Sequence, residues 1–293
     1  MNILITGVNG QVGFELLQTL HNLGNIIPSN RSTLDLSDLN IVRKIIRELK
    51  PSIIINSAAY TAVDKAETEL DNAYRLNADV PRVLAEEAVS LNAALIHYST
   101  DYVFDGTKKS AYLETDLTNP KNFYGFTKLE GENAIKTSGC AYIILRTSWI
   151  YGRRGKNFLS RILKLRSEMS QLYVVSNQKG APTWSRTIAT ATSHIITQII
   201  SSEDIQSWWA KYSGIYHLTS SGSTSWYGFT KAIFETEIKD NILKIIPILL
   251  SDYPAKAARP INSCLAINKL KNIFGLQMPS WIDALQLCLN SID

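Results

Sequence analysis

The sequence predicts an α/β fold in which a parallel sheet carries helices on both of its faces. Short apolar runs alternate with longer amphipathic stretches through the first half of the 293-residue chain. The runs hold apolar residues at successive positions, as strands do when both faces of a sheet are buried. Strand and helix in alternation predict parallel βαβ units. A turn with three glycines follows the first run, as at the first strand–helix junction of such sheets.

The elements of the first half follow in order from these patterns. Uninterrupted apolar runs predict strands at 2–6, 25–29, 52–56, 94–99 and 142–148. Apolar residues at helical spacing predict helices between them at 12–23, 39–50 and 80–91. Ser37 or Asp38 is expected to cap the second of these helices, because both side chains can accept a hydrogen bond from its first turn.

Beyond residue 150 the alternation of apolar runs and amphipathic stretches is less regular. A helix is expected at 157–168, strands at 172–177 and 214–221, and a closing helix at 280–289. We expect residues 1–150 to form the sheet domain and stretches near 172–220 to return to it. Residues 151–293 are expected to form mainly a smaller C-terminal region.

The amino-acid composition and the distribution of charge indicate a globular protein and argue against nucleic-acid and membrane partners. Hydrophobic residues make up 45% of the chain and charged residues 19%, as in globular proteins, and the net charge is only +4. Lys and Arg are scattered, which argues against a nucleic-acid partner. Three cysteines without metal-binding spacing indicate a reducing compartment. No apolar run reaches the ~20 residues of a membrane helix, and "MNILITG" is too short for a signal peptide. We therefore expect a cytoplasmic protein without a membrane partner.

The glycine turn "GVNGQVG" predicts a dinucleotide site. Gly7, Gly10 and Gly13 let the backbone turn tightly and approach a pyrophosphate at the N-terminus of the following helix. Three glycines alone also occur in turns that bind nothing. The strand before them and the amphipathic helix after them are the context that makes the motif specific, and they predict a Rossmann-type, doubly wound sheet.

The end of the second strand bears on the choice of cofactor. An acidic residue often binds the ribose of NAD at this point, but this chain has Asn30 and Arg31. Arg31 can meet the 2′-phosphate of NADP or can be an ordinary surface residue. Asp35 can approach the adenine or ribose, or can belong to the start of the next helix. These residues therefore do not decide whether the cofactor is NADPH or NADH.

A second group of residues predicts acid–base chemistry. Thr100 follows a central strand, at the carboxyl edge where ligands of parallel sheets bind. Asn119 and Pro120 predict the start of a helix on which Tyr124 and Lys128 share one face. A free tyrosine has a pKa near roughly 10, and a neighbouring ammonium lowers it. Thr100 would then bind a substrate carbonyl, Lys128 the nicotinamide ribose, and Tyr124 would donate a proton as a hydride arrives.

The pentapeptide "YGFTK" of residues 124–128 recurs at residues 227–231. The likeness continues after the pentapeptide. Glu235, Ile238 and Lys239 of the second copy match Glu132, Ile135 and Lys136 of the first. In the second copy an apolar stripe at helical spacing predicts packing, with Lys231 reaching water. This stripe comprises Trp226, Phe229, Ala232 and Ile233. No cofactor loop belongs to this copy, so we expect no catalytic role for it.

These motifs resemble the extended short-chain dehydrogenase/reductases. More narrowly, "AAYTAVDKAE", "IHYSTDYVF", "RTSWIYG", "GAPT" and "ARPINS" are similar, in this order, to segments of the dTDP-4-dehydrorhamnose reductase family. The resemblance spans nearly the whole chain. It implies NAD(P)H-dependent reduction of the 4-keto group of dTDP-4-dehydro-L-rhamnose to dTDP-L-rhamnose, with residues 151–293 binding mainly the sugar nucleotide. It also implies that rhamnose is made for a surface polysaccharide.

The resemblance also assigns residues to the site. It gives catalytic roles to Thr100, Tyr124 and Lys128. It implies cofactor contacts by Gly10, Gln11 and Val12 at the diphosphate, by Asp35 and Leu36 at the adenosine, and by Ala59, Tyr60, Thr61 and Tyr98. Asp101 and Trp149 would face the sugar nucleotide, although Trp149 can equally be a core residue. Asn157 in "GKNF" and Arg259 in "ARPINS" favour binding of its diphosphate.

Two positions depart from the family pattern. Histidine is frequent in the family where this chain has Tyr60. Some members bind Mg²⁺ at a dimer interface through a glutamate shortly after "GAPT", where this chain has Arg186. A cation cannot ligate Mg²⁺. We therefore expect no bound metal, and a monomer or a weak homodimer that no metal bridges.

Two other functions are compatible with the same motifs. An epimerase, or a reductase of another nucleotide sugar, would keep the fold and change the chemistry. A non-catalytic regulatory subunit would keep only dinucleotide binding. The complete set of Thr100, Tyr124 and Lys128 argues against the regulatory subunit, because binding alone does not need all three.

Overall fold

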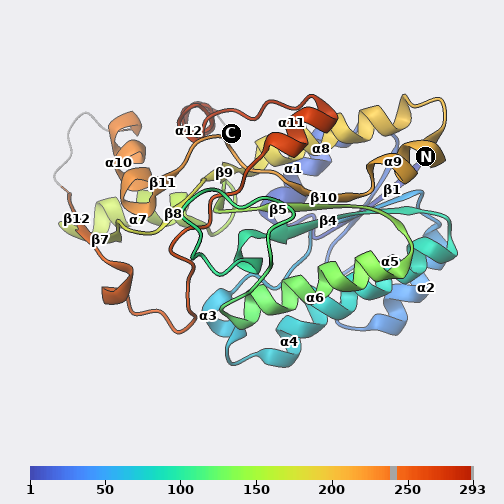
Figure 1. The fold of residues 1–293 in the computed structure, drawn as a ribbon, viewed down its shortest axis with the longest axis horizontal. Helices are drawn as coiled ribbons and strands as arrows, with labels where there is room; N and C mark the ends of the chain where they lie inside the picture. Colours follow the sequence, from blue (N-terminus) through green and yellow to red (C-terminus); the bar gives the residue numbers. More distant parts are fainter. Residues whose placement is uncertain (238–242, 292–293) are drawn as a thin grey trace.

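The computed structural model describes residues 1–237 and 243–291 and is built around one six-stranded parallel sheet (Figure 1). The strand order is β10-β5-β4-β3-β1-β2. These strands are β1 (Asn2–Thr6), β2 (Asn25–Ser29), β3 (Ile53–Asn56), β4 (Ala94–Thr100), β5 (Ala141–Thr147) and β10 (Gly214–His217). The first five lie within a residue of the predicted runs, whereas β10 starts where predicted but ends at His217, four residues before the predicted end at 221. The α/β, doubly wound class is confirmed.

The order of the strands reverses around β1. Strand β2 pairs with one edge of β1 and β3 with the other, both in parallel. The loops that leave β1 and β3 therefore diverge at the carboxyl edge of the sheet. A crevice at such a switch point is where open α/β sheets bind their ligands.

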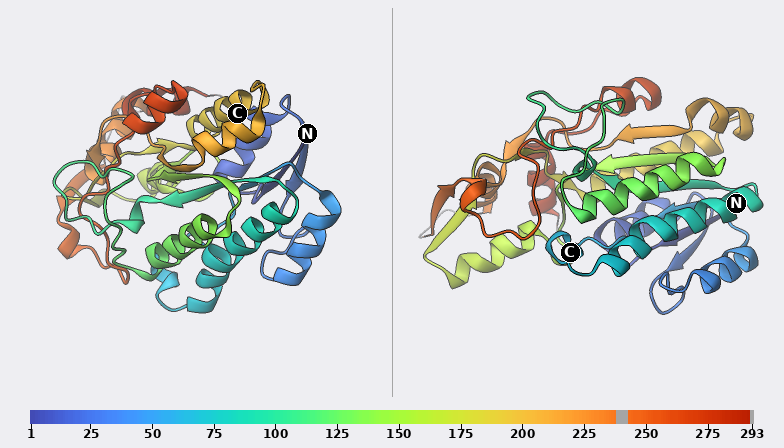
Figure 2. Two further views of the ribbon diagram at one scale, coloured as in Figure 1. Left: turned by 45° about the vertical axis from the view of Figure 1, so that its right-hand side comes forward. Right: turned by 60° about the horizontal axis from the view of Figure 1, so that its bottom comes forward.

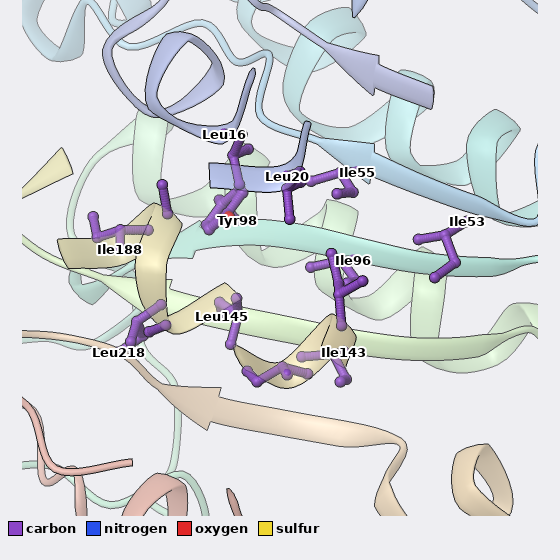
Figure 3. Close-up of a cluster of buried hydrophobic side chains, with 14 of the residues drawn as sticks. Leu16, Leu20, Ile53, Ile55, Ile96, Tyr98, Ile143, Leu145, Ile188 and Leu218 are labelled. Atoms are coloured by element: carbon purple, nitrogen blue, oxygen red, sulfur yellow. The ribbon is translucent and has the colours of Figure 1, made fainter. Parts of the chain in front are cut away.

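Helices cover both faces of the sheet (Figures 1 and 2). One face carries α1 (Gln11–Leu20), α8 (Ser185–Ile200), α9 (Ile205–Tyr212) and α11 (Asn268–Phe274). The other carries α2 (Leu39–Leu49), α5 (Val80–Ser90) and α6 (Phe123–Ser138). Figure 3 shows Leu16 and Leu20 of α1 and Ile188 of α8 packed against the sheet side chains of the first face. Short helical segments join β3 to α5: α3 (Val63–Ala66), α4 (Leu70–Tyr74) and a π-helical turn (Arg75–Asp79).

A second core lies beyond the carboxyl edge of the sheet and belongs to the C-terminal region. It is formed by α7 (Phe158–Glu168), α10 (Trp226–Glu237), α12 (Trp281–Asn290) and paired strands β7 (Gln171–Val175) and β12 (Lys244–Ile248). Two-residue strands complete it, with β6 (Ile150–Tyr151) paired to β9 (Thr183–Trp184), and β8 (Lys179–Gly180) paired to β11 (Thr224–Ser225). Within the described residues, no helix has the length and apolar character needed to cross a membrane.

The second "YGFTK" lies at the start of α10 and packs as predicted. Phe229 and Ile233 are fully buried in the second core, and Trp226 and Ala232 lie partly buried against it. Lys231 is exposed. Ile238 and Lys239, where the likeness to the first copy was expected to continue, lie outside the described residues.

Candidate active site

A pocket of about 450 Å³ occupies the switch point of the sheet. Many of the predicted cofactor residues line it: Gly7, Gly10, Arg31, Asp35, Leu36, Ala59 and Tyr60. Asn9, Ala58 and Arg75 line it as well. The other predicted cofactor residues are outside this lining: Gln11, Val12, Gly13, Thr61, Tyr98, Tyr124 and Lys128. The hydroxyl of Tyr98 is hydrogen-bonded to Thr192 of α8 (2.7 Å), on the opposite face of the sheet from α6.

The glycine turn fits a diphosphate closely. Gly7 has a positive φ of 70°, and a Cβ at Gly13 would lie 2.3 Å from the Gly7 carbonyl oxygen, so neither position accepts a side chain. Helix α1 begins after Gly10, with no side-chain cap and no acidic residue in its first turn. Its first N–H groups are therefore free to bind an anion.

The end of this pocket near Asp35 carries two arginines. Arg31 and Arg75 are both exposed at its edge, and Arg75 donates to the Ser37 carbonyl oxygen (3.3 Å). Asp35 accepts from the backbone N–H and the hydroxyl of Ser37, and these hydrogen bonds lower the pKa of its carboxyl. Asp38, the second of the two predicted caps, caps α2. Arg75 was missed from the sequence, because nothing local marks the π-helical turn that brings it to the pocket.

The predicted catalytic residues meet at the carboxyl end of β4. Thr100 ends the strand and donates from Oγ1 to Asp101 Oδ1 (3.0 Å). The Thr100 side chain is also hydrogen-bonded to Tyr124, and the Tyr124 ring meets the Tyr102 ring edge-on at 5.7 Å. Asp101 is buried beside them, and burial raises the pKa of its carboxyl to about 7.

The predicted start of the catalytic helix was wrong by three residues. Helix α6 begins at Phe123 and is capped by Asn122, which accepts from the Gly125 N–H (2.8 Å). Asn119 instead donates its side-chain N–H to Asp105 (3.1 Å) and its backbone N–H to Val103 (2.9 Å). Both asparagines can cap, and the partners of Asn119 decide between them.

The expected lowering of the Tyr124 pKa was also wrong. Burial raises the pKa of Tyr124 to about 12, and the hydrogen bond with Thr100 offsets this only in part. Lys128 is fully buried and donates from Nζ to the Tyr98 carbonyl oxygen (2.6 Å) rather than to the phenol. Burial lowers the pKa of Lys128 itself to about 8. Tyr124 therefore stays protonated at neutral pH, which suits a proton donor.

A second pocket, of about 220 Å³, lies in the C-terminal region and is lined by Tyr102, whose ring contacts that of Tyr124. Tyr102, Phe158 and Trp226 supply aromatic walls, and Arg161 and Arg259 supply charge. Arg259 donates to Asp64 (2.8 Å), which ties the "ARPINS" loop to the sheet domain. Apolar walls with a few placed cations are typical of pockets for charged aromatic ligands.

Two predicted substrate residues make other contacts. Trp149 is 8% exposed and stacks on Trp226 with ring centroids 3.6 Å apart, so Trp226 and not Trp149 lines the pocket. Asn157 caps α7 and donates to the Gly152 carbonyl oxygen (2.7 Å). The side-chain amide of Asn157 is therefore occupied within the protein.

Comparison with known proteins now identifies the family. The chain matches the RmlD substrate binding domain over residues 1–293. It belongs to the RmlD family. The dTDP-4-dehydrorhamnose reductase of Burkholderia thailandensis is 42% identical over 100% of this chain and 99% of its own length. That of Escherichia coli K12 is 39% identical over 100% of this chain and 98% of its own length. The Bacillus anthracis reductase, solved in complex with NADP, superposes with a TM-score of 0.89 at 36% identity over 98% of both chains.

Arg186, which departs from the pattern of some RmlD members, forms an ion pair. Its Nε lies 2.9 Å from Glu15 Oε2, and its guanidinium stacks over Trp184. In the described part of the chain, no three His, Cys, Asp or Glu side chains gather as a metal site would require. The carboxylate of Glu15 is already paired with a cation, the guanidinium of Arg186.

We expect the molar mass in light scattering to be the same with Mg²⁺ as with a chelator, because Arg186 repels a divalent ion near Glu15. The matched variant Arg186→Glu removes that repulsion and adds a carboxylate, so only this variant should respond to Mg²⁺. A Mg²⁺-dependent change of mass in the unmodified protein would contradict this prediction.

Proposed function

We propose that this chain reduces the 4-keto group of dTDP-4-dehydro-L-rhamnose with NADPH or NADH, giving dTDP-L-rhamnose in the cytoplasm. The observation that carries this proposal is similarity over the full length to reductases of that name. Supporting it, the relative solved with NADP has the same fold, and the glycine turn with the uncapped start of α1 fits a dinucleotide diphosphate. Residues 1–150 would hold the cofactor, joined by parts of 172–220, and residues 151–293 mainly the sugar nucleotide.

The cofactor would supply a hydride, and the side chains at the end of β4 would manage the proton. Thr100 donates a hydrogen bond to the substrate carbonyl and orients it beside Tyr124. Tyr124, protonated at neutral pH, gives its proton to the oxygen as the carbonyl becomes an alcohol. Lys128 holds the nicotinamide ribose and returns a proton toward Tyr124. In the structure the Thr100 hydroxyl donates to Asp101, so it would turn from Asp101 to the substrate carbonyl when the substrate binds.

The second pocket would hold the sugar nucleotide. Phe158 and Trp226 offer flat apolar surfaces to the base, and Arg161 and Arg259 offer guanidinium groups to the diphosphate. Tyr102 belongs to this pocket and also contacts Tyr124, so a sugar held there lies next to the proton donor. The Asp64 carboxylate fixes Arg259 for this role.

The direct test is oxidation of NADPH and NADH, followed by absorbance, with dTDP-4-dehydro-L-rhamnose as substrate. Turnover with at least one cofactor and formation of dTDP-L-rhamnose are expected. Absence of turnover with both would refute the proposal. Turnover only with another nucleotide sugar, or epimerised product without net oxidation of the cofactor, would favour the alternative chemistry.

We expect Arg31→Ala combined with Arg75→Ala to raise the KM for NADPH by at least about 100-fold and to leave the KM for NADH nearly unchanged. The reason is that each guanidinium can form a charge-assisted hydrogen bond only with the 2′-phosphate, and one such bond is worth about 1.5–3 kcal/mol. Steady-state kinetics with both cofactors measure it. Arg82→Ala is the control, since Arg82 pairs with Asp79 and Glu86 away from the pocket. Equal changes for both cofactors would show that the arginines do not read the phosphate.

A further inference from the structure

Three buried polar side chains form a row across three neighbouring central strands of the sheet, at the carboxyl ends of β1 and β3. Thr6 of β1, Asn56 of β3 and His97 of β4 are aligned in register, and each is 0% exposed. Apolar residues occupy the neighbouring positions, such as Ile55, Ile96 and Ile144. Buried polar groups cost free energy unless they are hydrogen-bonded. The hydrogen-bond partners of these three side chains therefore need to be identified.

The row connects to the proposed catalytic lysine. Thr6 Oγ1 lies 2.7 Å from Asn56 Oδ1, Asn56 Nδ2 lies 3.1 Å from His97 Nδ1, and His97 Nε2 lies 3.2 Å from Lys128 Nζ. At its far end, Thr6 Oγ1 accepts from the Ala58 N–H (3.4 Å) in the loop that lines the cofactor pocket. An unbroken chain of hydrogen bonds therefore runs from this loop to Lys128.

Each member of this chain can reverse its hydrogen bonds. When Asn56 donates to His97 Nδ1, the neutral imidazole carries its proton on Nε2 and donates to Lys128, which must then be a neutral amine. When the Asn56 amide is turned by 180°, its oxygen accepts from Nδ1–H, and Nε2 accepts from the Lys128 ammonium. The two arrangements differ by one proton on Lys128 and by the ring nitrogen that holds the single imidazole proton.

We propose that His97 is a positioning residue for Lys128, and that its tautomer changes with the protonation state of Lys128. Asn56 and Thr6 keep the imidazole hydrogen-bonded at both ring nitrogens in either arrangement, because the amide can present its oxygen or its nitrogen to Nδ1 and Thr6 can donate or accept. The lysine can thus give up a proton and regain one inside a buried site while its hydrogen bond with the imidazole is kept. This inference rests on the proposed function, in which Lys128 returns a proton toward Tyr124.

The charges around the row are compatible with this role. Burial and the nearby Lys128 hold the pKa of His97 well below its usual range, so the imidazole is neutral and has one proton to place. Glu132, one turn after Lys128 on α6, is the carboxylate that favours the ammonium. Glu132 is itself neutralised by Arg146 of β5. Tyr124 lies one turn before Lys128, and it is uncharged at neutral pH.

The test is the ¹⁵N NMR spectrum of the histidine side chains in the unmodified protein, measured at about pH 6.5 and about pH 9.5, on either side of the Lys128 pKa. The signal of His97 is assigned from its loss in His97→Gln. We expect the Nδ1–H tautomer at the lower pH and the Nε2–H tautomer at the higher pH. In Lys128→Met the change of tautomer should be absent. One tautomer at both pH values, or an imidazolium at the lower one, would overturn the inference.

Kinetics give a second readout. In His97→Leu the ammonium loses one acceptor, so the apparent pKa of kcat/KM that belongs to Lys128 should fall by about one unit. His97→Gln, whose amide can donate or accept, should restore it. A loss of kcat/KM that is equal at every pH in both variants would mean that His97 only packs. The NMR test needs no substrate, so its failure would overturn this inference alone, whereas absence of turnover in the unmodified protein would overturn the proposed function.

Discussion

Tyr124→Phe is expected to lose nearly all turnover, by ~10²–10⁴-fold in kcat, which is the usual contribution of a general acid. The substitution removes only the hydroxyl that is hydrogen-bonded to Thr100. The ring, its edge-on contact with Tyr102 and the cofactor pocket stay as they are. KM for NADPH should therefore change little. Steady-state rates, together with cofactor binding followed by fluorescence, measure both effects.

The chain supplies its own control in the second "YGFTK". Tyr227→Phe removes the same hydroxyl from the same pentapeptide, but Tyr227 packs against the second core, and Lys231 after it is exposed. This variant should keep most of its turnover. If Tyr227→Phe were the inactive variant and Tyr124→Phe the active one, the site would have been assigned to the wrong helix.

Glu132→Ala is expected to reduce the free energy of unfolding by about 3–5 kcal/mol, the range for breaking one partner of a buried ion pair. Glu132 and Arg146 are 0% and 2% exposed at their side chains and form two hydrogen bonds of 2.8 and 2.6 Å. Ser99 donates to the same carboxylate (2.5 Å). Without Glu132, the Arg146 guanidinium would remain buried between β5 and α6 with its charge uncompensated. Denaturation by urea, followed by circular dichroism, measures the change.

Two comparisons separate this effect from general damage to α6. Glu235 occupies the matching position after the second "YGFTK" and is exposed on α10, so Glu235→Ala should change the free energy of unfolding by no more than ~0.5 kcal/mol. The double variant Glu132→Leu with Arg146→Met removes both charges and should recover much of the lost stability. Equal losses in Glu132→Ala and Glu235→Ala would contradict the account of the ion pair.

The sheet could be predicted from the sequence because its central strands β1, β3 and β4 are buried and appear in the sequence as runs made up largely of apolar residues. Helix α8 was not predicted, although it is among the longest helices of the described residues. Its residues 185–200 are dominated by Thr and Ile, whose branched side chains favour strands in isolation. Packing of Ile188 and Ile195 against the sheet and α1 overrides that local preference.

Some residues of the candidate site could likewise be predicted from the sequence, and others could not. Thr100, Tyr124 and Lys128 could be found from the sequence, because a strand end marks Thr100, helical spacing joins Tyr124 to Lys128, and the family resemblance links all three. Arg75, Arg161 and Trp226 reach their pockets through tertiary packing, which no local pattern records. Trp149 and Trp226 illustrate the difficulty, because one stacks on the other and only one of the two lines the pocket.

The last strand of the sheet has a consequence for how the protein is made. Strand β10 pairs with β5, yet residues 148–213 separate the two in the chain. While a ribosome synthesises those residues, the β5 edge has no neighbouring strand and the face under α8 is open to solvent. Pairing across so long an interval is slow, because the chain must close a large loop first. The unpaired edge is meanwhile a place where a second nascent chain can add a strand. Completion of the sheet therefore waits until residues 214–217 have been made.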